Sequence, residues 1–319
     1  MVILVWLAIV LATCFGVRDS GESSQTLTNA AYDRNKPLDG FLFAIMTSPH
    51  KRDVRENIRK TWGEALHEQG GIYKFFLGQS PADYSPIPLD EDDVVHLNFI
   101  DSYGNLTRKT QCAAKWGTSI PSMRFLVKID DDVYPSIKRI ADIASTLPQT
   151  GLYAGETCRH GEEALPDTSG KWGLAEHFRG RLPNGLYPKY ADGPMYILSS
   201  DVAGLLGEKC NPLAPDSETF PFEDINTALV ALKHNITVND LNLYRNFLLG
   251  THEANVVQYF TEHVGEWQTC TGRYVGYHQM NPSQMLEAYE AERNGGYEGL
   301  RKYMCLPASH FDPTNPHVK

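Results

Sequence analysis

Short apolar runs alternate with segments of helical character along the first half of the chain. The runs are rich in Phe, Ile, Leu and Val and are too short for a confident helix, so they indicate strands. Strands are predicted over 40–46, 72–77, 94–99 and 124–129. Helices are predicted over 52–62, 106–116, 137–147 and 223–233. This alternation favours an α/β fold with a mixed, mostly parallel central sheet flanked by helices.

The pattern loosens over 157–193, which is rich in Gly, Pro and charged residues. It contains no repeat and no linker long enough to separate two domains. We therefore expect a single domain over 40–319.

The N-terminal segment 1–17 is almost wholly apolar, and Arg18 is the first charged residue. Its length suits a signal peptide and lies at the lower edge for a membrane span, so it is either a signal peptide or a signal-anchor. The polar segment 18–39 reads as a stem. Both readings send the chain into the secretory pathway, where Asn105 and Asn235 stand in glycosylation sequons.

An oxidising compartment changes the meaning of the cysteines, because thiols there form disulfides. Beyond Cys14 the chain has five: Cys112, Cys158, Cys210, Cys270 and Cys305. We expect one or two disulfides and at least one free thiol, with the pairing left open. No two of these cysteines are close in sequence, which disfavours a zinc site.

Composition places the chain among ordinary globular proteins, with 42% hydrophobic and 21% charged residues. The net charge of −10 argues against a nucleic-acid partner, for which a basic surface would be expected. The acidic run 90–93 is most simply a solvated turn before the next strand.

Three adjacent carboxylates, Asp130, Asp131 and Asp132, end the apolar run 124–129. Ligands of open α/β sheets gather at the carboxyl ends of strands, and adjacent like charges need a counter-ion. A hard divalent cation with oxygen ligands is the natural candidate. The alternative is an acidic loop that only terminates the strand.

Several segments, in order, resemble the inverting β1,3-glycosyltransferases of glycosyltransferase family 31, which make β1,3-galactosyl and β1,3-N-acetylglucosaminyl linkages. The matching segments are 55–63, 75–78, 101–110, 128–133, 187–193 and 223–225. The resemblance implies a GT-A fold with a nucleotide-binding half (about 40–150) and an acceptor half (about 151–290). It also implies a UDP-sugar donor, a glycan acceptor, Mn²⁺ (or Mg²⁺) as cofactor, and the Golgi membrane as location. An uncleaved N-terminus would make the chain a single-pass type II protein with a lumenal catalytic domain.

By this resemblance Asp132 binds the metal, while Asp130 and Asp131 position the nucleotide. Lys128 balances the triplet or supports the strand. A C-terminal histidine completes the metal shell in the family, and His278 is the best positional match. His263 and His310 are the competing candidates.

An inverting transfer needs one base on the acceptor hydroxyl. Asp224 is our candidate and Glu223 the fallback, since both open a predicted helix. Helix N-termini stabilise carboxylates, so capping is the structural alternative.

Other candidate site residues have weaker support. Arg55 and Arg59 lie on one face of the predicted helix and either bind the donor phosphates or form internal salt bridges. Trp172, Tyr187 and Tyr190 offer flat faces for an acceptor sugar.

Three readings of the function compete. The preferred one is a metal-dependent inverting hexosyltransferase that moves galactose or N-acetylglucosamine to a 3-hydroxyl, with galactose favoured. A prenyl-diphosphate enzyme would place its aspartates on long helices, contrary to the strand-like run 124–129. A non-catalytic sugar-binding or scaffolding relative is the remaining alternative.

Overall fold

The computed structural model describes residues 36–80, 91–157, 163–167, 170–215, 218–240, 261–263 and 276–304. The apolar segment 1–17, the stem up to residue 35, and His310 lie outside the described residues. The same holds for Cys14, Cys158, Cys270 and Cys305. Within the described ranges, every helix is too short or too polar to span a bilayer.

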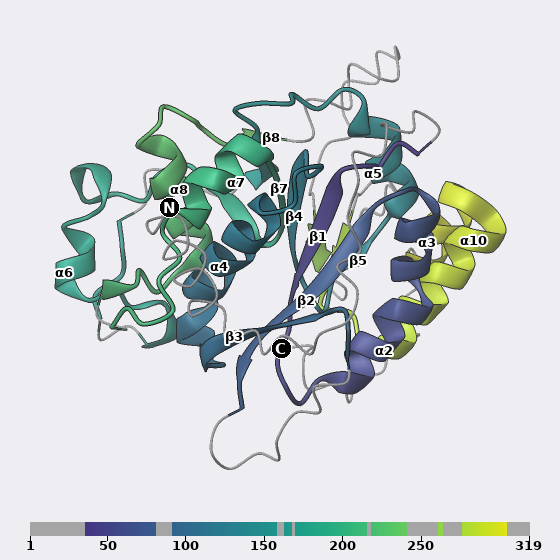
Figure 1. Cartoon of the computed structure of the whole chain (residues 1–319), viewed down its shortest axis with the longest axis horizontal. Helices are drawn as coiled ribbons and strands as arrows, with labels where there is room; N and C mark the ends of the chain where they lie inside the picture. Colours follow the sequence, from purple (N-terminus) through teal and green to yellow (C-terminus); the bar gives the residue numbers. More distant parts are fainter. Residues whose placement is uncertain are drawn as a thin grey trace, which may run out of the picture.

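A twisted central sheet forms the middle layer of the molecule (Figure 1). Its described strands run in the order β3 (Val94–Ile100), β2 (Ile72–Gln79), β1 (Phe41–Met46), β4 (Phe125–Asp130), β7 (Ala191–Ser199), β6 (Tyr153–Thr157) and β8 (Asn239–Asp240). Neighbours are parallel except where β7 pairs antiparallel with β4 and with β6. The predicted mixed, mostly parallel sheet is confirmed.

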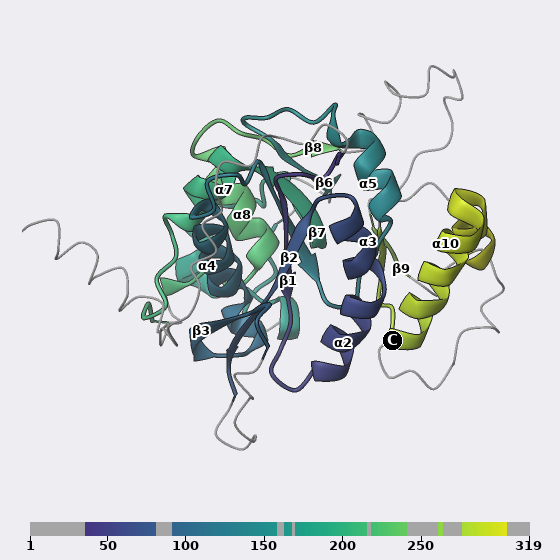
Figure 2. The same cartoon turned by 45° about the vertical axis from the view of Figure 1, so that its right-hand side comes forward.

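Helices cover both faces of the sheet (Figures 1 and 2). One face packs against α2 (Arg52–Lys60), α3 (Trp62–Glu68), α5 (Ile137–Ala144) and α10 (Pro282–Met304). The other packs against α4 (Leu106–Thr118), α7 (Ser200–Gly207) and α8 (Glu223–Leu232). Among its described residues, the segment predicted to be loose carries the short helices η2 (Gly170–Trp172), α6 (Glu176–Arg179) and η3 (Pro183–Gly185), between the end of β6 and the start of β7. The two larger apolar clusters therefore lie on opposite faces of the sheet, and a third, smaller one includes Phe178, Phe220 and Phe222.

The helix predicted over 52–62 is broken. Thr61 leaves helical geometry, with φ −121° and ψ −115°, and its hydroxyl donates to the carbonyl of Asn57 at 2.8 Å. A threonine that bonds back to its own helix offers the backbone an alternative to the next helical turn. The turn starts α3 at Trp62, which is fully buried in the core.

A small second sheet lies beside the end of β4. Its strands are β5 (Tyr134–Pro135), β10 (Gly276–His278) and β9 (Thr261–His263). β10 pairs antiparallel with β5, and the amide of Met280 donates to the carbonyl of Asp132 at 2.9 Å. The C-terminal strand is thus tied to the aspartate loop, which the sequence pattern did not show.

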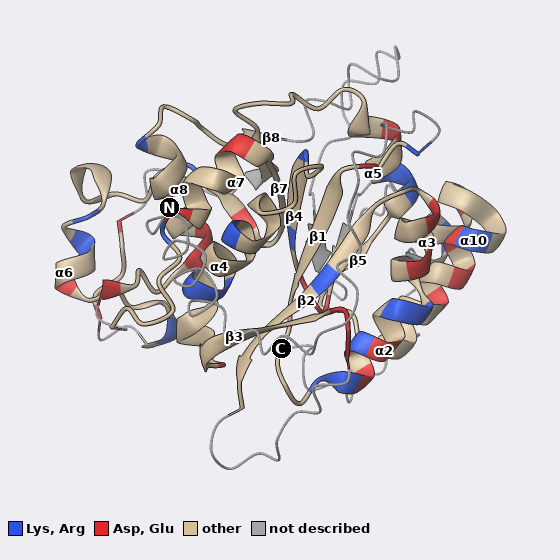
Figure 3. Ribbon diagram, viewed as in Figure 1, with Lys and Arg blue, Asp and Glu red and all other residues tan. Residues whose placement is uncertain are grey.

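The acidic run before β3 forms the expected turn, with Asp92 exposed, but Glu91 and Asp93 are ion-paired and not only solvated. Glu91 accepts two hydrogen bonds from Arg55, at 2.8 and 3.0 Å, and the guanidinium of Arg59 lies 2.5 Å from Glu91 and 2.6 Å from Asp93. Bonding to Arg55 lowers the pKa of Glu91 to about 2 despite its burial, with a further contribution from Arg59. Figure 3 shows the acidic ribbon that leads into β3 beside the basic positions of α2.

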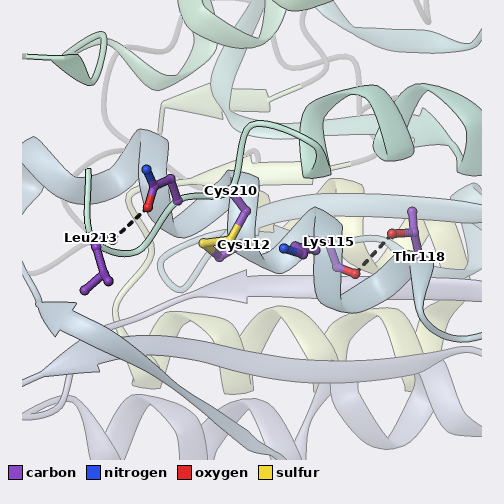
Figure 4. The surroundings of a disulfide bond; sticks show 6 residues. Cys112, Lys115, Thr118, Cys210 and Leu213 are labelled. Carbon is purple, nitrogen blue, oxygen red and sulfur yellow. Dashed lines mark hydrogen bonds between the residues drawn. A yellow bond between two sulfur atoms is a disulfide. The ribbon is translucent and has the colours of Figure 1, made fainter. Parts of the chain in front are cut away.

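A disulfide joins Cys112 of α4 to Cys210, just after α7 (Figure 4). The bridged residues are 98 positions apart, so the chain-entropy model assigns the bond about 4–5 kcal/mol. Gly207 is required here, because a Cβ would lie 2.8 Å from the backbone of Lys115. The expectation of at least one disulfide is confirmed, and the bond fixes two helices on the face of the sheet that also carries α8.

Candidate active site

A cavity of about 930 Å³ opens at the carboxyl end of β4. The start of β7, the first turn of α8 and the end of β10 form its other walls. β7 runs antiparallel to β4, so its N-terminal residues lie where β4 ends. The charged and amide-bearing side chains of the lining are mainly acidic and comprise Lys128, Asp130, Asp132, Glu163, Lys171, Asp192, Glu223, Asp224, His278 and Gln279.

Asp130, Asp132 and His278 form a cluster with metal-ligand geometry. One ligand atom from each lies within 4.8 Å of the others, and Nε2 of His278 is 3.5 Å from Oδ1 of Asp132. Two carboxylates and one imidazole that line a cavity can hold a divalent cation. The sequence predicts Asp132 and His278 as metal ligands and Asp130 as a residue that positions the nucleotide, and the structure brings all three together. The side chain of His263 and all of His310 lie outside the described residues.

Electrostatics tie this cluster together. Burial disfavours the charged form of both partners, but their mutual contact outweighs it: the pKa of Asp132 is lowered and that of His278 is raised. Burial raises the pKa of Asp130 to about 6, opposed by Lys128 and assisted by the charge of Asp132. A bound cation would relieve the repulsion between the two carboxylates.

Asp131 does not share this arrangement. It is buried, and its two oxygens accept from the hydroxyl of Thr47 and the ammonium of Lys51, each at 2.7 Å. Burial raises its pKa although both partners oppose this. Asp131 therefore anchors the loop after β1, and it is not among the residues that line the cavity, so its predicted role in positioning the nucleotide stays a prediction. Sequence reasoning singled out neither Thr47 nor Lys51.

Lys109 is a buried cation that joins the carboxyl ends of β1, β2 and β3. Lys109 donates to both carboxylate oxygens of Asp101, at 2.9 and 2.8 Å, and to the carbonyl of Thr47 at 2.6 Å. Asp101 in turn accepts from the amide of Gly78 at 2.6 Å. This explains the matched segment 101–110 as a structural clamp behind the site.

Asp224 projects from the first turn of α8 into the cavity. Its Oδ1 accepts from the amide of Ile225 at 2.8 Å. Burial and the adjacent charge of Glu223 raise the pKa of Asp224 to about 7, with this amide bond opposing the rise. A carboxylate that titrates near neutral pH in a cavity is well suited to accept a proton.

Glu223 occupies a different environment. It is only 5% exposed, and its Oε1 accepts hydrogen bonds from Tyr196 and, at 3.2 Å, from Thr227. These bonds turn the carboxylate toward the protein, which weakens its case as the fallback base.

Aromatic side chains form one wall of the cavity. Trp172 is 52% exposed, and its ring lies 6.0 Å from that of Phe222 and 6.5 Å from that of Tyr103. Tyr187 and Tyr190 line the same wall. The three aromatic residues predicted from the sequence are brought together, and Tyr103 is an addition. Its place in the matched segment 101–110 was the signal that could have found it.

Arg55 and Arg59 are not in the lining of the cavity. Their salt bridges with Glu91 and Asp93 bear out the internal alternative, and a donor-binding role gains no support from these contacts.

The chain matches the galactosyltransferase family model over residues 53–242. It belongs to the galactosyltransferase family. The matched region includes the aspartate triplet and Asp224, whereas His278 lies beyond it.

Relatives in plants and animals carry the same kind of name. The chain is 25% identical to hydroxyproline O-galactosyltransferase GALT2 of Arabidopsis thaliana, over 78% of this chain but only 35% of that protein. It is 24% identical to human β-1,3-galactosyltransferase 5, over 80% of this chain and 79% of the relative. It is 30% identical to mouse β-1,3-galactosyltransferase 1, over 52% and 53%. The chain thus spans about a third of the length of GALT2.

Solved structures are more distant. A glycosyltransferase involved in glycosylation of the major capsid of PBCV-1 aligns with a TM-score of 0.40 and 14% identity, over 78% of this chain and 98% of that one. The galactosyltransferase LgtC, in complex with donor and acceptor sugar analogs, aligns with a TM-score of 0.35 and 9% identity, over 82% and 95%. Both likenesses are too loose to inform the site of this galactosyltransferase family member.

The two sequons of this galactosyltransferase family member differ in accessibility. Asn105 is 7% exposed, and its Nδ2, the atom that would carry a glycan, donates to the carbonyl of Ile100 at 2.9 Å. Asn235 is exposed at the end of α8 and has a φ of 60°. The folded structure therefore weighs against Asn105, and Asn235 is the better candidate.

Proposed function

We propose that this galactosyltransferase family member is a metal-dependent inverting β1,3-galactosyltransferase, which moves galactose from UDP-galactose to a 3-hydroxyl of an acceptor glycan. One observation carries the proposal: the cluster of Asp130, Asp132 and His278 and the carboxylate of Asp224 line the same cavity. The names of the β1,3-galactosyltransferase relatives support the sugar and the linkage.

On the donor side, Asp130, Asp132 and His278 would hold Mn²⁺ or Mg²⁺. Such an ion supplies Lewis-acid stabilisation of the charge that develops on a diphosphate leaving group. The protein keeps these ligands in place through β10, whose pairing with β5 is reinforced by the Met280–Asp132 backbone bond.

On the acceptor side, Asp224 would take the proton of the attacking hydroxyl. The bond from that oxygen to the anomeric carbon forms as the bond from the anomeric carbon to the phosphate oxygen breaks, and UDP leaves with the electron pair. Attack from the face opposite the leaving group inverts the anomeric centre. The wall of Trp172, Tyr187 and Tyr190 would hold the acceptor sugar by stacking.

We further propose the Golgi membrane as the location, with the domain in the lumen and segment 1–17 as the anchor. The buried Cys112–Cys210 disulfide supports an oxidising compartment.

The experiment is a donor screen with the full chain, expressed in a eukaryotic secretory host and purified in detergent. UDP release is measured with UDP-galactose and UDP-N-acetylglucosamine, on acceptors ending in galactose or N-acetylglucosamine, with EDTA and after Mn²⁺ is added back. We expect Mn²⁺-dependent transfer from UDP-galactose. Preference for UDP-N-acetylglucosamine would overturn the sugar, and no transfer by the folded protein would favour the non-catalytic relative.

A further inference from the structure

Lys128 is a fully buried ammonium at the junction of the two halves of the site. It has no exposed surface, and its Nζ donates to Oδ1 of Asp130 and to the carbonyl of Gly193, each at 2.5 Å. It also lies 3.5 Å from Oε2 of Glu223. The sequence left two roles open for Lys128, balancing the aspartate triplet or supporting the strand, and balancing the triplet accounts only for the contact with Asp130.

The strand geometry explains why Lys128 reaches Glu223. Side chains alternate along β4, so Lys128 shares the face of Leu126, which packs on α7 and α8. Its direct partner across the strand pair is Tyr196 of β7. The hydroxyl of Tyr196 donates to Oε1 of Glu223. Two adjacent strands thus present an ammonium and a phenol to one carboxylate at the start of α8.

Glu223 uses both carboxylate oxygens inside the protein. Oε1 accepts from Tyr196 and Thr227, whereas Oε2 has no hydrogen-bond donor within the described residues and faces the ammonium of Lys128. A buried carboxylate arranged in this way is costly unless its ionic partner stays in place. Its position is therefore coupled to that of Lys128.

We propose that Lys128, Glu223, Tyr196 and Thr227, here called the Lys128 network, position the catalytic base relative to the metal cluster. Lys128 holds Asp130 on the metal side and, through Glu223, the first turn of α8 from which Asp224 projects. Glu223 is thereby a positioning residue and not the base. This inference rests on the proposed function, because it assigns Asp224 the acceptor proton.

The network also sets the electrostatic surroundings of Asp224. The groups that face it are Glu223 on its own helix, Asp192 of β7, Lys128 of β4, and the phenols of Tyr103 and Tyr187. After burial, Glu223 contributes most to the raised pKa of Asp224, while Lys128 opposes it. Removing the charge of Glu223 should therefore let Asp224 ionise at lower pH.

The test compares Glu223→Gln with Glu292→Gln in the full chain. Glu292 is a matched control: it accepts hydrogen bonds from Tyr134, at 2.8 Å, and from Ser136, and it does not line the cavity. For Glu223→Gln we expect kcat to fall about 10–100-fold through misplacement of Asp224, with the donor KM changed less than about 3-fold. The pH of half-maximal kcat should fall by about half to one unit. Glu292→Gln should leave the pH of half-maximal kcat unchanged, because Glu292 does not face Asp224.

A second measurement does not depend on transfer. The Asp224 carboxyl is followed by ¹³C NMR in the metal-free chain, assigned with Asp224→Asn, and its titration midpoint should move to lower pH in Glu223→Gln. If the wild-type chain transfers no sugar but the midpoint still moves in Glu223→Gln, the proposed function is overturned, while the electrostatic coupling of Glu223 to Asp224 is upheld. Tyr196→Phe provides a milder variant, which should lower kcat several-fold without moving the midpoint. Wild-type kcat and an unchanged midpoint in Glu223→Gln would overturn the network, as would a fully active Asp224→Asn.

Discussion

Asp224→Asn is the substitution that best separates proton transfer from donor binding. Asparagine has nearly the same shape as aspartate. Its amide oxygen can still accept the hydrogen bond that the backbone amide of Ile225 donates to Oδ1 of Asp224, which is 2.8 Å long in the wild-type chain. It cannot take a proton from the acceptor. Loss of a positioned base costs about 10²–10⁴-fold in rate, which corresponds to roughly 3–5.5 kcal/mol of transition-state stabilisation.

The pH dependence follows from the raised pKa of Asp224, about 7. Only the ionised carboxylate can act as the base, so wild-type kcat should level off above pH 7 and fall about tenfold per pH unit below it. At pH 6 about a tenth of the plateau rate should remain.

The contribution of Asp224 to the free energy of unfolding should fall with rising pH, whereas kcat should rise. The pKa of Asp224 is 3.8 in the unfolded chain and about 7 in the folded one, so the folded state binds the proton more tightly. Its contribution to the free energy of unfolding is therefore fully present below pH 3.8 and is lost as the pH rises through 7. The ionised form therefore costs the fold at most about 4 kcal/mol above pH 7, and solvent relaxation reduces this to roughly 1–3 kcal/mol. The asparagine side chain introduced by Asp224→Asn would carry no charge and no such cost. The variant should therefore unfold at a higher temperature than wild type at pH 8 and at the same temperature near pH 3.5.

The assay measures transfer at saturating donor and Mn²⁺, UDP binding by calorimetry, and thermal unfolding at both pH values. We expect transfer to collapse, UDP to bind at near wild-type affinity, and thermal stability to rise at pH 8. Wild-type transfer by Asp224→Asn would refute its role as base. Loss of UDP binding would show that Asp224 serves the donor and not the acceptor.

Three further outcomes test other parts of the structure. EDTA should abolish transfer and Mn²⁺ restore it, and Asp132→Asn should weaken Mn²⁺-dependent UDP binding, measured by calorimetry; full activity in excess EDTA would contradict the metal site. Glu91→Gln should lower the free energy of unfolding by about 2–4 kcal/mol at pH 7, because it leaves Arg55 buried without its ionic partner, whereas the exposed neighbour Asp92→Asn should leave it unchanged. The Glu91 contribution should be complete above pH 4.5 and disappear as the pH falls through about 2, as followed by denaturant titration. If wild-type protein from a eukaryotic host loses mass on N-glycosidase treatment, Asn235→Gln protein should lose none. A variant that loses as much mass as wild type would place the glycan at another residue.

The sequence alone determined the features that depend on neighbouring residues. Runs rich in Phe, Ile, Leu and Val gave β1, β2, β3 and β4 close to their observed bounds, because strand formation there needs only local pattern and burial. The aspartates follow β4 directly, and Asp224 stands at a helix start, so position indicated a cation site and a candidate base, whose individual roles come from the family resemblance. The family resemblance extended this to His278.

The tertiary structure decided the features that depend on which segments meet. Acidity alone suggested a solvated turn around Glu91, and only the fold brought it to Arg55. The antiparallel insertion of β7 carries Gly193 and Tyr196 to Lys128, and the pairing of β10 with β5 carries His278 to Asp132. Spacing along the chain does not encode such contacts, because they form only when strands that are far apart in sequence pair and bury their charged side chains together. That burial places Asp130 and Asp132 in the cluster with His278 while Asp131 bonds to Thr47 and Lys51, and it gives Glu223 and Asp224 the different surroundings on which their proposed roles rest.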